Sequence, residues 1–220
     1  RPDEKNVRKD LNEKTAHSVH YAVIVLREAD KAIARQVFKT PLIFSVREAK
    51  GLEYRNIIIF NLVSSSRREF DEVCEGVDGS ELQGELKYSR NRDKTDKSLE
   101  IFKFFINSMY VAVTRAIENL YWIEHDSRHA VFRLLNLQST QDNLKLSAAS
   151  SSSDEWRQEA AKLAAQGKQE QASRILSDVL KLVPVPWEIT TRENFLKLVQ
   201  EALDPVKYSN KAKQRLLDYA

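Results

Sequence analysis

The sequence is poor in cysteine and glycine. Cys74 is the one cysteine, so an internal disulfide and a thiolate zinc cluster are both excluded, and we expect a reducing compartment, cytoplasmic or nuclear. The five glycines form neither G-x-G-x-x-G nor G-x-x-x-x-G-K-[ST]. The chain therefore lacks both common phosphate loops, and we do not expect it to hydrolyse a nucleotide alone.

Long apolar runs and an excess of one charge are also lacking. No stretch approaches the ~20 apolar residues that cross a bilayer, and the charged N-terminus has no signal-peptide core, so no membrane partner is expected. The 35 basic and 32 acidic residues leave a net charge of +3, too small to indicate a nucleic-acid partner. With 42% hydrophobic residues the chain is globular. It begins with arginine rather than methionine, which suggests a piece of a longer protein.

Strand-like and helix-like segments alternate from residue 20 to residue 137. Continuous apolar runs predict strands that are buried on both faces, as in a parallel sheet, and stripes at spacings of three and four predict helices. Residues 64–97 are poor in apolar side chains and are expected to form a solvated surface loop. The alternative is that the basic end of this loop lies near phosphates. We expect an α/β fold whose strand order the pattern leaves open, with strands at 21–26, 42–46, 56–63 and 119–123 and helices at 27–38, 98–116 and 128–137.

The composition changes after residue 137. Residues 138–153 are polar, end in four serines and are typical of a linker. Every later periodic segment is helical, including one helix opened by the capping box Thr190-x-x-Glu193 and one started by Ser209. The predicted organisation is a lead-in or the end of a preceding element (1–19), an α/β domain (20–137), a linker (138–153) and a smaller all-α domain (154–220).

The first part of this helical region has the length of a known repeat. Residues 151–184 span 34 positions and are predicted to form a helical hairpin, either generic or tetratricopeptide-like, with Gly167 in its turn. A single such hairpin leaves apolar faces uncovered, because repeats of this kind normally stack. We therefore expect the helical tail to dock a protein partner or the rest of its own chain.

Two short motifs carry the functional information. A-K-G-L-E-Y at 49–54 lies between two predicted strands, and Y-V-A-V-T-R-A at 110–116 ends the helix before the last strand. The first resembles motif V (A-K-G-L-E-F) of superfamily 1 helicases of the UvrD/Rep type, and the second resembles their motif VI (Y-V-A-[LV]-T-R-A). Both occur in the order and between the elements that the family requires. The resemblance covers residues 20–125.

The resemblance implies the C-terminal RecA-like domain of an ATP-dependent helicase or translocase. Such a domain closes over ATP and Mg that are held mainly by an N-terminal RecA-like domain of the same parent chain, and it holds part of a single-stranded nucleic acid, with DNA expected. Arg115 would be the arginine finger, because a guanidinium stabilises charge on the phosphoryl oxygens. Thr114 would cap or orient that arginine.

The motif V segment would contribute the nucleotide-binding residues Lys50, Gly51 and Glu53. In the family the glutamate contacts the ribose, and the glycine permits a close backbone approach. Arg47 stands where the family commonly has a histidine that helps to couple the nucleic-acid and nucleotide sites, so we expect it at the nucleic-acid or coupling site.

Each of these residues also has a simpler interpretation. Arg115 can satisfy the last-turn carbonyls of its helix, and Lys50 and Glu53 can form a loop salt bridge with each other or with Arg55. The Walker motifs and the large helical insertion ahead of motif V are absent from the chain. The alternative function is therefore a non-catalytic helicase-like scaffold or protein-interaction module. His125 and His129 lack a third ligand and predict no metal site, and the side chains expected in the core are Tyr54, Tyr110 and Val113.

Overall fold

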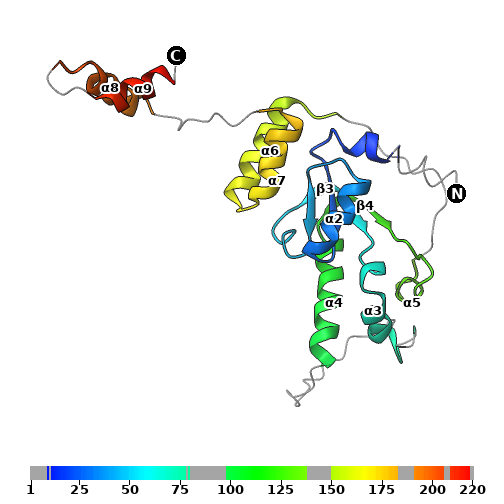
Figure 1. Cartoon of the computed structure of the whole chain (residues 1–220). Helices are drawn as coiled ribbons and strands as arrows, with labels where there is room; N and C mark the ends of the chain where they lie inside the picture. Colours follow the sequence, from blue (N-terminus) through cyan, green and yellow to red (C-terminus); the bar gives the residue numbers. More distant parts are fainter. Residues whose placement is uncertain are drawn as a thin grey trace. The chain divides into compact units, whose positions relative to one another are not determined.

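The computed structural model describes residues 9, 11–77, 79, 98–137, 150–182, 191–205 and 209–218 (Figure 1). The chain divides into two compact units, Arg1–Lys181 and Leu182–Ala220. Across these described ranges, no helix is both long enough and apolar enough to span a membrane.

The first unit is built on a four-stranded parallel sheet with strand order β2-β1-β3-β4. This arrangement confirms the predicted α/β fold. The three strands β1, β2 and β3 are almost entirely buried, which explains why the sequence shows continuous apolar runs there instead of alternation. The strands are β1 (Tyr21–Val25), β2 (Ile43–Ser45), β3 (Tyr54–Phe60) and β4 (Ala116–Ile123).

Helices cover both faces of this sheet (Figure 1). One face packs against α2 (Lys31–Val37), which follows the 3-10 turn η1 (Glu28–Asp30). The other face packs against α3 (Arg67–Cys74), α4 (Ser98–Val113) and α5 (Ala130–Leu134). Because successive strand residues point to opposite faces, the sheet divides its own apolar side chains between two cores. Ala22, Ile24, Ile57 and Ile59 join one core, and Tyr21, Val23, Val25, Ile58 and Phe60 join the other.

Helix α3 corrects the expectation of a loop over residues 64–97. A 3-10 turn, η2 (Ser64–Ser66), leads directly into this helix. Phe70 and Val73 are three residues apart and buried, and the Phe70 ring lies 5.0 Å from the ring of Phe105 on α4. Five of the eight helix residues are charged, so the low apolar content of this segment predicts a loop. The spacing of its few apolar residues, which form a narrow stripe, is the signal of the helix. The basic end of the expected loop, Lys87–Lys97, lies outside the described residues.

A helical hairpin belongs to the same unit as the sheet. It consists of α6 (Ser153–Ala165), α7 (Gln169–Arg174) and the π-helical turn η4 (Ile175–Val179), with Gly167 at a φ of 75° in the turn. Trp156, Leu163 and Ile175 are buried in one core with residues of the sheet. The two compact units divide after residue 181, because this large apolar surface packs on the α/β core, and residues 138–149 of the expected linker lie outside the described residues.

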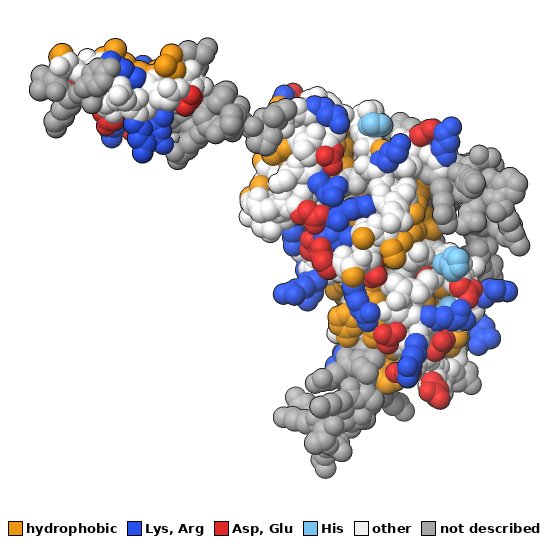
Figure 2. Space-filling model, viewed as in Figure 1, with side chains coloured by type: hydrophobic (Ala, Val, Ile, Leu, Met, Phe, Trp, Pro, Cys, Tyr) orange, Lys and Arg blue, Asp and Glu red, His pale blue; other side chains and the backbone are white. Residues whose placement is uncertain are grey.

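The second unit contains the helices α8 (Arg192–Leu203) and α9 (Asn210–Leu217). Ser209 caps α9 as predicted, but Thr191 rather than Thr190 caps α8, accepting a hydrogen bond from the amide of Asn194. Hydrophobic side chains gather along one side of this unit and basic side chains along another (Figure 2). Leu203 and Leu217 are 71% and 67% exposed, so this small unit leaves apolar surface uncovered.

The packing of the hairpin can be tested with Trp156→Ala. Because the indole is 2% exposed within the core shared with the sheet, we expect the free energy of unfolding to fall by ~3–5 kcal/mol in a single urea transition. Gln158→Ala, on the exposed side of α6, should change it by less than about 0.5 kcal/mol. A separate early loss of helical signal, with the main transition unmoved, would show that the hairpin does not share this core.

Candidate functional site

A cleft of about 920 Å³ lies at the carboxyl ends of β1 and β2. Ligands of open parallel α/β sheets bind outside the carboxyl ends of the strands. The cleft is lined by residues that follow β1, by residues that follow β2, and by one side of α4. These residues include Arg27 and Glu28 after β1, Arg47, Glu48 and Lys50 after β2, and Phe104, Asn107 and Tyr110 on α4.

The charged side chains of this cleft that lack a partner among the described residues are basic. Arg47 and Lys50 are exposed, and neither forms a hydrogen bond or ion pair with any residue that the structure describes. Arg27, which the sequence analysis did not single out, also lines the cleft. Its Nη2 lies 3.4 Å from Glu69 Oε1, and its Cζ lies 5.9 Å from the centre of the Phe105 ring. The sequence signal that could have identified Arg27 is its position two residues after the buried strand β1.

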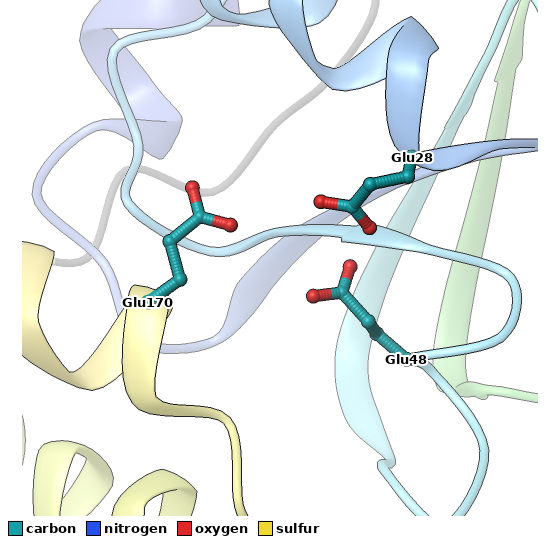
Figure 3. A group of neighbouring side chains, drawn as sticks. All are labelled: Glu28, Glu48 and Glu170. Atoms are coloured by element: carbon teal, nitrogen blue, oxygen red, sulfur yellow. The ribbon is translucent and has the colours of Figure 1, made fainter.

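The carboxylates at the edge of the cleft are already neutralised. Figure 3 shows Glu28, Glu48 and Glu170 pointing toward one another, close enough to hold a cation. That cation is the ammonium of Lys31, whose side chain is 1% exposed. Lys31 Nζ lies 2.5 Å from Glu28, 3.0 Å from Glu48 and 2.6 Å from Glu170, and Glu170 also pairs with Arg35. The group is an ion-pair cluster and offers no vacant metal site.

Glu48 is held in its ionised form by these contacts. Partial burial by itself raises the pKa of this carboxyl, but hydrogen bonds from the Ser45 amide, Lys31 and Gln171 outweigh burial. The pKa of Glu48 therefore lies below the ordinary value for glutamate. The sequence analysis missed both Glu48 and Gln171, which lie 123 positions apart and share no local pattern.

Arg115, the predicted arginine finger, connects the two motif segments but does not line the large cleft. Its Nη1 donates to the carbonyl oxygen of Leu52 at 3.3 Å, and its Nε donates to the carbonyl oxygen of Val111 at 3.1 Å. Its Nη2 donates to Thr114 Oγ1 at 3.1 Å, so the Thr114 hydroxyl helps to hold the guanidinium. Three of the five guanidinium N–H groups are therefore engaged.

The predicted nucleotide-binding residues of the loop open onto two different clefts. Lys50 faces the large cleft, whereas Glu53 lines a smaller one of about 360 Å³ together with His20, Arg55 and Glu155. Among the described residues, Lys50 and Glu53 form none of the salt bridges considered above. Arg55 pairs with Glu118 instead, at 3.3 Å.

Gly51 between them has a φ of 80°, in the left-handed region that favours glycine. A Cβ built there meets nothing within 4 Å. The backbone conformation, and not a close approach within the described chain, therefore explains the glycine.

The aromatic residues of the motifs are divided between core and surface. Tyr54 is buried as expected, and its hydroxyl donates to Glu159 Oε1 at 2.6 Å. Burial and the Glu159 carboxylate raise the pKa of Tyr54 above its usual value. Tyr110 and Val113 were expected in the core but are 67% and 36% exposed, because the buried stripe of α4 runs through Phe105, Met109 and Ala112 instead.

His129 has a structural role. His129 is buried and caps α5, with its Nδ1 accepting from the amide of Val131 at 3.1 Å and its Nε2 3.0 Å from Asp71 Oδ1. His125 is exposed, and the pair forms no metal-binding cluster among the described residues.

Comparison of the chain with protein-family models, with curated proteins and with solved structures found no match in any of the three. The resemblance to superfamily 1 helicases therefore rests on the sequences of residues 49–54 and 110–116.

Acid titration of Glu48→Gln tests the ion-pair cluster. Because the folded-state pKa of Glu48 is depressed, its contribution to stability is present above the unfolded value of about 4.3 and is lost as the pH falls through the folded pKa. We expect Glu48→Gln to lower the free energy of unfolding by about 1–2 kcal/mol at pH 7. Below pH ~4.3 the variant should lose less stability than the wild type, because it lacks the carboxylate that becomes protonated there. The measurement is urea unfolding between pH 3 and pH 7. Exposed Glu72→Gln is the control, and a parallel shift at every pH would contradict the assignment.

Proposed function

We propose that this chain is the second motor domain of a UvrD-like, ATP-dependent helicase or translocase. The observation that carries the proposal is the direct contact between the two helicase-like segments. Arg115 donates a side-chain hydrogen bond to the carbonyl of Leu52, and the amide of Tyr54 donates to the carbonyl of Arg115 at 3.1 Å. Segments 55 residues apart thus form one structural unit beside a cleft at the carboxyl ends of a parallel sheet.

The charges of this region suit a shared nucleotide site. Arg47 and Lys50, which have no partner among the described residues, offer cations to phosphate oxygens, and Glu53, equally unpaired there, offers a carboxylate to a ribose hydroxyl. Both acidic residues that line the large cleft are bound to Lys31, so Mg ligands would come mainly from an N-terminal RecA-like domain. That domain would also supply the Walker motifs and most contacts to ATP.

Arg115 would act as the finger after exchanging its present partners for phosphate oxygens. Its bonds to Leu52 and Val111 use neutral carbonyl acceptors. Bonds between charged partners are stronger than bonds to neutral acceptors, so a triphosphate brought close by domain closure can compete for the guanidinium. Repeated closure and opening, driven by hydrolysis, would move the protein along a single strand of DNA, and binding to that strand would be sensitive to salt.

One observation favours a second candidate, a helicase-like scaffold without catalysis. The guanidinium of Arg115 already stabilises the loop through the carbonyl of Leu52, which is a purely structural role. The exposed Leu203 and Leu217 of the second unit would then serve to dock a partner protein.

The two candidates differ in ATP hydrolysis by the full-length protein. The motor proposal predicts hydrolysis that single-stranded DNA stimulates, measured by phosphate release, with the present 220-residue chain as an inactive control. Absence of hydrolysis by a folded full-length protein, with and without DNA, would overturn the motor proposal and favour the scaffold.

Replacement of Arg115 tests its assignment within that protein. We expect Arg115→Ala to lower the turnover number by ~10³–10⁵, because an arginine finger stabilises charge in the transition state. Arg128→Ala, whose side chain is 93% exposed, is the matched control and should leave turnover unchanged. Thermal unfolding of both variants separates loss of the finger from loss of the fold. Unchanged turnover in a folded Arg115→Ala protein would show that Arg115 is not the arginine finger.

A further inference from the structure

We propose that helix α7 positions the β2–β3 loop (residues 46–53) through Gln171 and Glu48, and thereby sets how Arg47 and Lys50 meet a polyphosphate ligand in the cleft. The ligand part of this inference rests on the proposed function. The positioning part rests on contacts within this chain alone.

The first contacts lie on the outer edge of β2. Strand β1 pairs with the inner edge, where the Leu42 carbonyl and the Val46 amide bond to β1. The backbone groups of Ile43 and Ser45 point away from β1, because bonding directions alternate along a strand. Gln171 Nε2 donates to the outward carbonyl of Ile43 at 2.9 Å, and the outward amide of Ser45 donates to Glu48 Oε2 at 2.8 Å.

Gln171 and Glu48, the two side chains that bind this edge, also contact each other. Gln171 Nε2 also lies 3.3 Å from Glu48 Oε1, and Ser45 Oγ donates to Glu48 Oε2 at 3.0 Å. Lys31 holds the same carboxylate from the side of α2. A side chain of α7 and a side chain of the loop therefore bind the edge of β2 together, in the place where a further strand would otherwise pair.

The anchored carboxylate lies next to the unpaired cations. Glu48 directly follows Arg47 and precedes Lys50 by two residues, in a turn that ends at Gly51. Because Arg47 and Lys50 have no partners among the described residues, the backbone on either side of Glu48 determines where their charges lie. Loosening Glu48 would spread those charges over more positions and raise the entropy lost on binding a ligand.

The burial of Gln171 supports a positioning role over a purely stabilising one. Its side chain is 1% exposed, and its Oε1 has no hydrogen-bond partner among the described residues. Such an unpaired acceptor is costly, and an apolar side chain of similar volume avoids that cost while giving up the two bonds from Nε2. Gln171→Met should therefore keep the fold and release the loop.

Hydrogen–deuterium exchange on the present chain tests the positioning. In Gln171→Met we expect the amides of Ser45 and residues 46–53 to exchange about 5- to 10-fold faster, while those of α6 stay unchanged. Gln158→Met, the same substitution at an exposed site of the hairpin, should leave the loop at the wild-type rate. Equal loop exchange in Gln171→Met and wild type would overturn the proposal. Faster exchange throughout α6 would also overturn it, because the residue would then hold the hairpin and not the loop.

ATP hydrolysis by the full-length protein tests the ligand part. We expect Gln171→Met to raise KM for MgATP about 3- to 10-fold and to leave kcat within about twofold, because the loop affects binding more than the chemical step. Faster loop exchange with unchanged KM would confirm positioning and overturn the role of the loop in nucleotide binding. Faster loop exchange in a protein without any hydrolysis would contradict the proposed function and leave the positioning intact.

Discussion

The first unit depends on the buried ammonium of Lys31. A charge removed from water is tolerated only when it is paired, and the partners of Lys31 come from the η1 turn before its helix, from the loop after β2 and from α7. All three must be in place together, so this one side chain connects residues 28, 48 and 170. The hairpin is consequently part of the α/β unit, although a polar segment separates it from the sheet in the sequence.

The strands and most helices of this unit were predictable because their signals are local. Apolar runs located all four strands, and the spacing of apolar residues located α4 and α6. Helix α3 escaped prediction because Phe70 and Val73 are few among many charges, and the width of the buried stripe on α4 was overestimated, so Tyr110 lies outside it. The roles of Glu48 and Gln171 had no local signal, since neither side chain finds the other before the chain is folded.

The loop after β2 combines two kinds of charged residue. Glu48 is fixed by three residues from three elements, whereas Arg47, Lys50 and Glu53 are exposed and unpaired in the described part of the chain. A rigid backbone that carries unpaired charges loses little entropy when a ligand binds, because the ordering has already been achieved by folding. Arg115, in the turn between α4 and β4, adds to this rigidity through its hydrogen bond to the Leu52 carbonyl, so the two motif segments are held together before any ligand binds.

The cover that the hairpin provides also protects the sheet from other chains. A strand edge with unsatisfied backbone groups is a template for pairing with a neighbouring molecule, and proteins commonly block such edges. Here the block on β2 comes partly from Gln171, a residue far along the chain, and Trp156 covers apolar surface of the same core. Removal of the hairpin would therefore expose an unpaired strand edge and an apolar face at once, and the shortened protein would be prone to aggregation.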